Sequence, residues 1–364
     1  MHHLQIYRTI HNNLAPISFQ KVSLADQFDN QLKAEECDTW KELCLHWKEN
    51  FFFTTEIQNT LATMIAVVLS TTTEGGQLGL RVIGPPGSAK STLAECLSEA
   101  MELVYSVSKF TGIVSGFGSV SDDQQTAKKI DGKCLLVKDA DPMMQMTNLA
   151  QIESELRDGL GDGVIRATYK TGRELEIRTL FTSILCGTKS LRGMDNALLG
   201  ARYIDIVIHN KDTPTRDIVR TAIKSQGRGI IDKLTRNLDN GTSSKDDGED
   251  NNNIDSTIRN GSDTTPEPNK RKPIINKLAP KTIGFLRKKK EYIDSGRVNI
   301  KYPNSIQEER IYAAGELIAF LRAKPDTTKG GELKYRVEKE LSTRLGELLI
   351  RLYLFLQIVI NDEE

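Results

Sequence analysis

The sequence has no excess charge of either sign. Lys and Arg together number 49, as do Asp and Glu, so the formal net charge is zero. No positive field of the whole chain therefore indicates nucleic-acid binding, and any contact with DNA has to come from local groups of basic residues.

Cysteine and histidine are also few, and long apolar runs are absent. The five cysteines are scattered and mostly lie in apolar stretches, and the five histidines show no metal-ligand spacing. Neither a disulfide framework nor a zinc site is indicated, which favours a reduced, cytoplasmic protein (in the host cytoplasm if the chain is viral). The apolar runs are too short to span a bilayer and the N-terminus has no apolar signal core, so we expect no membrane association.

The most informative stretch is a short apolar run that breaks into a loop of Gly and Pro. Residues 80–83 indicate a buried strand, residues 84–89 form the loop, and a helical apolar pattern starts at Lys90. A strand, a loop and a helix in this order are typical of a phosphate-binding loop, whose backbone N–H groups and helix N-terminus face an anion. The expected nucleotide-binding residues are Gly84, Pro85, Pro86, Gly87, Ser88, Ala89, Lys90, Ser91 and Thr92.

At the end of this loop, the pattern predicts roles for two side chains. Lys90 would reach the β- and γ-phosphates of ATP, and the Ser91 hydroxyl would bind Mg²⁺. Ala89 stands where the pattern G-x-x-x-x-G-K-[ST] has its last glycine. Alanine is the smallest change at that position, so the departure is minor.

An acid follows a second strand pattern. The run 134–139 ends in Asp139, which would hold Mg²⁺ together with Ser91. The glutamate that usually follows such an acid and polarises the attacking water is missing here. Asp141 either takes that role, with slow hydrolysis as a further alternative, or only opens a turn with Pro142.

Short apolar runs alternate with helical patterns over the central part of the chain. Strands followed by helices predict an α/β fold with a parallel sheet and helices on both faces. Strands are expected at 80–83, within 107–114, and at 134–139, 180–186 and 203–208; helices are expected around Trp40–Trp47 and at 54–70, 306–321 and 337–360.

A predicted β-hairpin carries a basic tip. Two β-prone runs, 164–169 and 174–178, flank a turn of Lys-Thr-Gly-Arg. The tip would hold Lys170 and Arg173, with Tyr169 beside them. Either these side chains contact a DNA backbone and stack on a base, or the turn is an ordinary solvated one.

Polar residues also follow the later strands. Thr188 comes after the run 180–186, where its side chain would lie next to the γ-phosphate. Arg192 and Arg202 come between that run and the run 203–208. An arginine there is either a surface ion-pair partner or a finger that reaches the γ-phosphate bound by a neighbouring subunit.

The order of these parts resembles that of AAA+ ATPases, and the hairpin before the polar strand end is similar to their pre-sensor 1 hairpin clade. Segments 342–352 (Ser-Thr-Arg-Leu-Gly-Glu-Leu-Leu-Ile-Arg-Leu) and 199–205 (Leu-Gly-Ala-Arg-Tyr-Ile-Asp) are similar to the lid helix and the finger segment of minichromosome maintenance helicases. The whole pattern also resembles ATPases of phages and mobile elements, although the zinc-bearing N-terminal domain of the helicases is missing. The resemblance implies Thr188 as first sensor, Arg202 as finger and Arg344 as second sensor.

The resemblance implies a P-loop NTPase with a five-stranded parallel sheet and a small α-helical lid. The expected parts are an N-terminal helical region (1–53), the ATPase core (54–212), the start of the lid (213–236), a disordered polar insertion (237–275) and the helical lid (276–364).

The function implied is that of an ATP- and Mg²⁺-dependent ring motor on DNA, helicase-like, in the replication of a virus or mobile element. The ring would be a homo-oligomer, expected to be a hexamer, with a loading or adaptor protein as a candidate partner. Two other functions stay open: a protein-remodelling ATPase of the chelatase or chaperone type, and a slow-hydrolysing ATP-dependent clamp.

Overall fold

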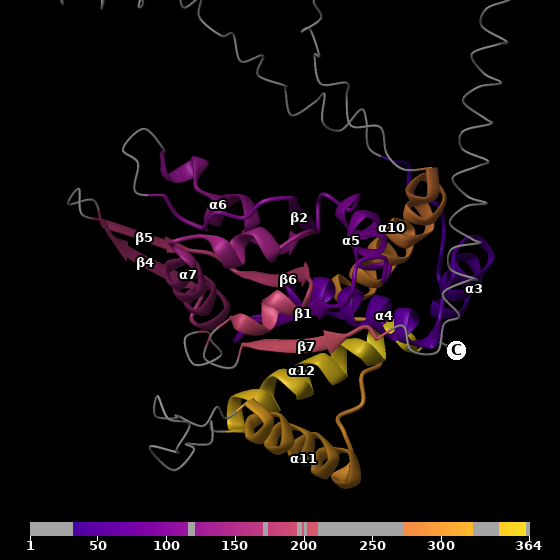
Figure 1. Cartoon of the computed structure of the whole chain (residues 1–364). Helices are drawn as coiled ribbons and strands as arrows, with labels where there is room; N and C mark the ends of the chain where they lie inside the picture. Colours follow the sequence, from indigo (N-terminus) through magenta and orange to yellow (C-terminus); the bar gives the residue numbers. More distant parts are fainter. Residues whose placement is uncertain are drawn as a thin grey trace, which may run out of the picture. The chain divides into compact units, whose positions relative to one another are not determined.

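A five-stranded parallel sheet lies at the centre of this α/β protein (Figure 1). All helices and strands discussed below belong to one compact unit, Ala34–Glu364. The computed structural model describes residues 32–115, 121–169, 174–194, 199, 202–209, 273–322 and 342–361.

The strand order is β2-β3-β6-β1-β7, and every neighbouring pair is parallel. The strands are β1 (Gly79–Ile83), β2 (Val104–Val107), β3 (Lys133–Val137), β6 (Phe181–Gly187) and β7 (Tyr203–Val207). The central strand β1 has β6 and β7 as neighbours, and Ile83 at its end is in register with Gly187 and Val207. The predicted parallel sheet is confirmed, and four of its strands lie where the apolar runs placed them.

The second strand lies earlier than predicted. We expected a strand within 107–114, but β2 ends at Val107 and residues 108–115 contain no strand. Ile113 and Val114 are nevertheless buried. Their backbone N–H groups donate to the carboxylate of Glu155, at 2.7 and 3.4 Å, instead of to a neighbouring strand. A side chain from a distant helix thus satisfies the buried backbone that a strand would otherwise satisfy.

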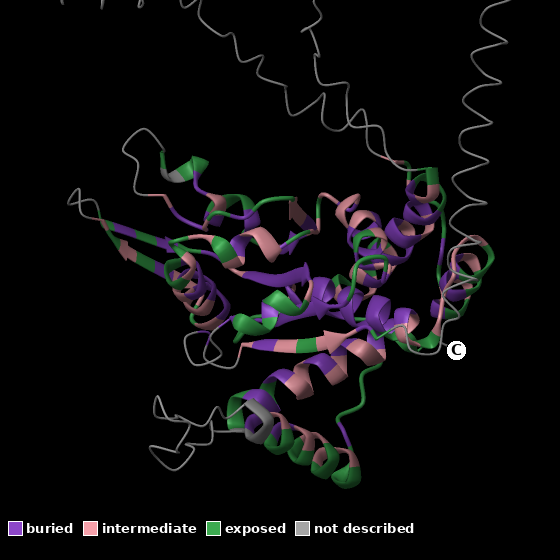
Figure 2. Ribbon diagram, viewed as in Figure 1, coloured by how far each residue is buried: buried purple, intermediate pink, exposed green. Residues whose placement is uncertain are grey.

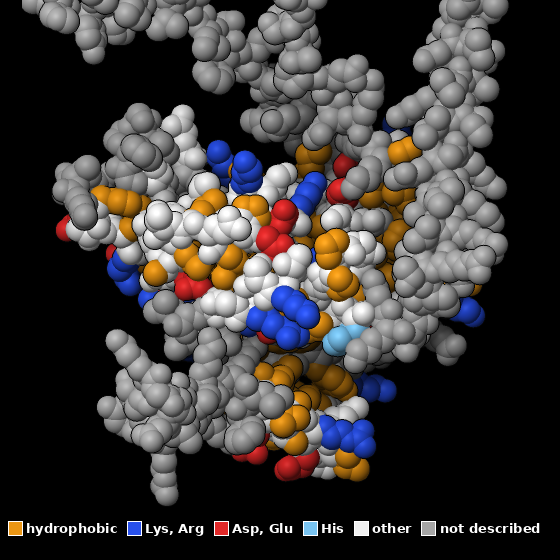
Figure 3. Space-filling model, in the orientation of Figure 1, with side chains coloured by type: hydrophobic (Ala, Val, Ile, Leu, Met, Phe, Trp, Pro, Cys, Tyr) orange, Lys and Arg blue, Asp and Glu red, His pale blue; other side chains and the backbone are white. Residues whose placement is uncertain are grey.

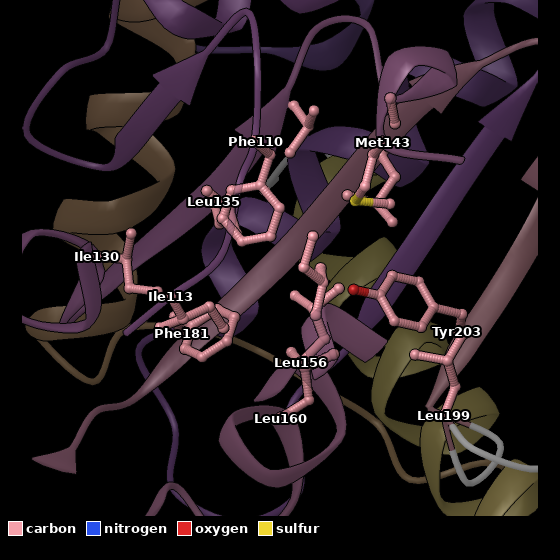
Figure 4. Packing of buried hydrophobic residues seen from close by; sticks show 14 of the residues in the cluster. Phe110, Ile113, Ile130, Leu135, Met143, Leu156, Leu160, Phe181, Leu199 and Tyr203 are labelled. Atoms are coloured by element: carbon pink, nitrogen blue, oxygen red, sulfur yellow. The ribbon is translucent and has the colours of Figure 1, made fainter. Parts of the chain in front are cut away.

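Helices cover both faces of the sheet, as the alternation of elements predicts. Side chains of successive strand residues point to opposite faces. Phe181 packs on Gly159 of α7 (Leu149–Gly161), whereas the hydroxyl of Thr182 bonds that of Thr71, which caps α4 (Thr55–Ser70). Figure 4 shows the core on the α7 side, where Leu156, Leu160 and Phe181 meet.

The remaining helices lie against different parts of this core. Helix α10 (Pro273–Asp294) packs on α3 (Trp40–Asn50) and α5 (Lys90–Ser98), whereas α12 (Ser342–Ile360) packs on α4 and α11 (Ser305–Arg322). In Figure 2 the sheet is mostly buried, whereas α11 is largely exposed. The Thr39 and Thr54 side chains cap α3 and α4 by accepting a backbone N–H three residues on.

The N-terminal tryptophan helix has the packing role that its spacing predicts. Four residues at helical spacing are buried on one side of α3: Trp40, Leu43, Cys44 and Trp47. The expected lid start at 213–236 lies outside the described residues, as does the expected insertion at 237–275 apart from its last three residues, which open α10.

The predicted hairpin is present as β4 (Val164–Thr168) and β5 (Glu174–Arg178), an antiparallel pair. Ile165, Leu175 and Ile177 are buried, whereas the exposed face carries an ion pair between Arg166 and Glu176. This period-two alternation is that of a two-stranded sheet with one face on the core.

Candidate functional site

The Gly/Pro loop (residues 84–89) lies at the carboxyl end of the central strand. It connects β1 to α5, and the Gly84 N–H donates to the carbonyl of Gly187 at the end of β6. Ligands of open α/β sheets bind in the crevice outside the carboxyl ends of the strands. The loop is therefore where a ligand of this sheet is expected.

Three positions of the loop show why it needs small residues. Gly87 has φ +79°, and Ala89 has φ 68°, which makes Ala89 the only non-glycine residue with positive φ in the described part of the chain. A Cβ on Gly84 would lie 2.6 Å from Ser88 Oγ and 3.2 Å from the Ile208 carbonyl oxygen. Ala89 thus adopts the left-handed conformation that the glycine of the sequence pattern would adopt easily.

This conformation leads straight into α5. Ala89 occupies the N-cap position of α5 and makes no side-chain cap hydrogen bond. The first N–H groups of a helix have no partner inside the helix and carry its partial positive charge. The start of α5 can therefore donate several hydrogen bonds to an anion in the loop.

Lys90 lies inside the curve of the loop. Its Nζ donates to the carbonyls of Gly84 at 2.6 Å and Pro85 at 2.8 Å, and to Ser88 Oγ at 3.1 Å. Burial lowers the pKa of the Lys90 ammonium, and the negative charges of Asp141 and Asp139 partly offset this. The structure thus brings both predicted acids close to Lys90.

The two acids have different surroundings. Asp139 follows β3, and its carboxylate is exposed and accepts the N–H of Asp141 at 3.2 Å. Asp141 starts the short 3₁₀ helix η2 (Asp141–Gln145) and is half-buried. Its carboxylate accepts the backbone N–H of Thr188 at 2.9 and 3.1 Å and the hydroxyl of Ser190.

The expected Mg²⁺ ligands fit a hard cation by chemistry. Ser91 is an exposed hydroxyl in the first turn of α5, and Asp139 is an exposed carboxylate. Oxygen ligands of this kind, few in number and completed by phosphate and water, are those that Mg²⁺ prefers. No group of three or more His, Cys, Asp or Glu that would hold a metal by itself occurs among the described residues.

Arg202 and Arg344 lie near the amino ends of the strands, whereas Arg192 is exposed in the 3₁₀ helix η3 (Lys189–Gly193) after β6. Arg202 precedes β7, and its carbonyl accepts the N–H of Gly79 at the start of β1. A five-residue strand is about 17 Å long, so Arg202 is at about that distance from the loop of its own chain. Burial lowers the pKa of the half-buried Arg202 guanidinium, and the positive charge of Arg344 lowers it further.

The structure thus brings Arg202 and Arg344 together, but not to the loop. The Arg202 guanidinium lies against Gly161 at the end of α7, where any side chain would collide with it. Its buried Nε has no hydrogen-bond partner within the described ranges. Arg344 is exposed near the start of α12.

The basic hairpin tip cannot be compared with the structure, because Lys170 and Arg173 lie outside the described residues. On the face shown in Figure 3, Lys and Arg side chains lie in several separate groups among acidic ones. This distribution agrees with the zero net charge of the sequence, and the described residues on that face form no single basic surface.

The comparisons with known proteins give no family. No protein-family model matches the chain, and no curated protein matches its sequence. The helices that the structure describes include none long and apolar enough to cross a membrane. The functional assignment therefore depends on the site itself.

Sequence reasoning missed two polar contacts near the site. Ser190 donates to Asp141, and nothing in its sequence context indicates this partner. Arg81 on β1 is fully buried and pairs with Asp205 on β7, Nε to Oδ1, at 2.6 Å. The signal for Arg81 was available, because it is the one charged residue in the apolar run 80–83.

Proposed function

We propose that this protein is an ATPase with a P-loop core of the AAA+ type. The observation that carries the proposal is the left-handed backbone at Ala89 directly before Lys90 at the start of α5. A non-glycine residue is held in this costly conformation only where the surrounding structure requires it, and such positions cluster at ligand sites. Here the left-handed conformation of Ala89 joins the loop directly to the N-terminus of α5, so that the N–H groups of both would face the same ligand.

Each polar group at the site would then have a task with ATP. The loop N–H groups and the N-terminus of α5 would bind the phosphates, and Lys90 would exchange its loop carbonyls for phosphate oxygens. Ser91 and Asp139 would hold Mg²⁺, which neutralises charge on the β- and γ-phosphates when bound. Thr188 would lie beside the γ-phosphate.

The arginine positions support a ring in which each site is shared. Arg202 and Arg344 lie near the amino ends of the strands, whereas the Gly/Pro loop lies at their carboxyl ends. The two arginines would therefore meet the triphosphate of a neighbouring subunit. A head-to-tail contact of this kind closes into a ring when its rotation is cyclic. Arg202 would stabilise the charge that develops on the γ-phosphate, and the helical elements at 276–364 would act as the lid that carries Arg344.

Within this ring, the substrate we propose is DNA. The hairpin tip with Lys170 and Arg173 would move along the DNA backbone as ATP is hydrolysed. The match of phosphate loop, hairpin and lid segment to helicase-like AAA+ ATPases supports this choice, as a likeness of sequence pattern.

A slow-hydrolysing clamp is the second candidate, and one observation favours it. Asp141 is the acid nearest in sequence to the position where the glutamate is expected. Its carboxylate already accepts hydrogen bonds from Thr188 and Ser190. A proton taken from water would weaken both of these hydrogen bonds. Tight ATP binding with negligible turnover would identify this function.

ATP binding is the first test. Lys90→Ala should abolish binding of a fluorescent ATP analogue, because the loop loses its only ammonium group. Lys128→Ala, which removes an exposed lysine on α6 (Thr126–Ile130), is the matched control and should bind normally. Unchanged affinity in Lys90→Ala would contradict the assignment of the loop.

The substrate is tested by measuring turnover of ATP with single-stranded DNA, double-stranded DNA and RNA. Stimulation by DNA that is lost in the Lys170→Ala/Arg173→Ala variant supports the motor. Stimulation only by a partner protein would instead indicate a remodelling ATPase.

A further inference from the structure

Asp141 holds the segment after β6 in place. Its carboxylate accepts the Thr188 N–H at 2.9 and 3.1 Å and the Ser190 hydroxyl. Thr188 is also the N-cap of η3 (Lys189–Gly193), and its Oγ1 accepts the Ser190 N–H at 3.5 Å. Two donors, the Thr188 N–H and the Ser190 hydroxyl, bind this one carboxylate, which therefore fixes the first three residues after the strand.

The Asp141 carboxylate lies close against the end of β6. A Cβ on Gly187 would lie 2.8 Å from Asp141 Oδ1 and 2.8 Å from the Leu191 side chain. Gly187 is the last residue of β6 and is in register with Ile83, the residue before the Gly/Pro loop. The position of the Asp141 carboxylate is thus set by packing on the strand next to β1.

The acid segment and the loop both contact the end of β6, because the Ala140 N–H donates to the Cys186 carbonyl and the Gly84 N–H to the Gly187 carbonyl. Asp139 accepts the N–H of Asp141, and both charges act on Lys90. The chain of contacts runs from the expected Mg²⁺ ligand, through Asp141, to Thr188. Removing the Asp141 carboxylate would leave the Thr188 N–H without its acceptor and release η3 from η2.

We propose that Asp141 is a positioning residue that sets the place of Thr188 at the γ-phosphate, and that it is not the base that activates water. The proposal depends on the ATPase assignment above. A proton taken from water would weaken the bonds that the charged carboxylate accepts from Thr188 and Ser190. The same carboxylate would then have to loosen its structural bonds in each turnover.

The conservative variant separates the two roles. In Asp141→Asn the side-chain oxygen still accepts the Thr188 N–H, and the amide can donate to the Ser190 oxygen, but the group can no longer take a proton. Asp141→Ala removes both abilities. Ser190→Ala removes one of the donors and leaves the carboxylate in place.

The experiment measures ATP turnover over a range of pH, ATP affinity, and hydrogen exchange of the Thr188 amide in wild type and the three variants. For a positioning residue we expect Asp141→Asn to keep kcat within about fivefold with an unchanged shape of the pH profile. Asp141→Ala should lose about 100-fold or less in kcat, with ATP affinity kept. The Thr188 amide should exchange faster in Asp141→Ala than in Asp141→Asn.

A base predicts another pattern. Asp141→Asn would then lose about 100-fold or more, as much as Asp141→Ala, and its pH profile would lose the limb due to a carboxylate. That result would overturn the proposal, as would equal exchange of the Thr188 amide in all variants.

Failure of the ATPase assignment is recognised separately. If the wild type binds no ATP, the proposed function is wrong, and the exchange of the Thr188 amide still decides whether Asp141 holds it. If Asp141→Ala does not fold, Asp141→Asn and Ser190→Ala carry the comparison.

Discussion

Ala89 is a residue under backbone strain. A left-handed alanine costs about 1–2 kcal/mol relative to an ordinary conformation. Glycine removes this cost, although it gives the unfolded chain about 0.4–1 kcal/mol of additional entropy. Ala89→Gly should therefore raise the free energy of unfolding by about 0.5 kcal/mol in urea titrations and leave ATP binding intact.

The control for this prediction is an alanine in ordinary helical conformation. Ala313 is exposed in the middle of α11, and Ala313→Gly should lower stability by about 1 kcal/mol. Loss of stability of the same size in Ala89→Gly would show that the left-handed backbone at Ala89 carries no strain.

Glu155 gives a prediction on pH. Burial raises the pKa of its carboxyl, although the N–H of Ile113 and the Gln151 amide stabilise the charged form. Because the folded pKa lies above the ordinary value of 4.5, stability is lost as pH rises through the folded pKa. Relative to wild type, Glu155→Gln should therefore gain stability as pH rises from acid to neutral.

Unfolding free energies of both proteins at several pH values measure this difference. Glu174→Gln, at an exposed position of β5, is the matched control. If the wild-type and Glu155→Gln profiles run parallel, the buried carboxyl does not influence stability in the way that its burial indicates.

Among the elements, one side chain of α12 binds the turn that follows α4. The Nη atoms of Arg351 donate to the backbone carbonyls of four residues between Ser70 and Gly76, at 2.6–3.1 Å. These carbonyls end α4 and form the turn that leads to β1. A guanidinium satisfies several acceptors at the negative end of a helix, which a neutral side chain cannot do.

Arg351→Ala should therefore lower the free energy of unfolding by about 1–2 kcal/mol, because the buried Ser70 carbonyl and three exposed carbonyls lose a charged donor. Arg351→Lys should recover part of this loss, since an ammonium group has three donors. Thermal or urea unfolding measures both. Glu347→Gln changes an exposed residue of the same helix and should change stability by about 0.5 kcal/mol or less.

The elements also show how far sequence reasoning reaches. Runs such as 134–139 and 180–186 predicted strands correctly because strands buried on both faces are rich in apolar residues. The strand predicted around Ile113 was wrong because the Ile113 N–H donates to the Glu155 carboxylate, 42 positions away, and not to a neighbouring strand. A local pattern carries no information about such a partner.

The candidate site likewise combines features that are local in the sequence with contacts between distant segments. Lys90 and its loop were visible in the sequence because their spacing is local, and the structure has a loop with a left-handed residue there, between β1 and α5. The bonds of Asp141 to Thr188 and Ser190 join segments almost 50 residues apart, and only the folded chain shows them. Arg202 lies at the amino end of β7, away from the loop, and this placement likewise follows from the parallel register of β1 and β7.

At the scale of the whole molecule, that placement bears on the proposed ring. Arg202 lies about 17 Å from the loop of its own chain, so the proposed action of Arg202 on a triphosphate would have to cross a subunit boundary. Arg202→Ala should keep ATP affinity close to normal and lower turnover by about 10³-fold, the effect expected of an arginine that stabilises the γ-phosphate in the transition state.

Mixing variants decides whether Arg202 acts on the next subunit. In random mixtures of equal parts Arg202→Ala and Lys90→Ala, about a quarter of the head-to-tail interfaces join an intact Lys90 to an intact Arg202. Turnover should then return to about that fraction of the wild-type rate if sites act independently. Mixtures of Lys90→Ala with Asp139→Ala place both defects on the same side of the interface and should restore nothing. A protein that sediments as a monomer while it hydrolyses ATP, or mixtures that never regain turnover, would show that Arg202 does not complete a neighbouring site.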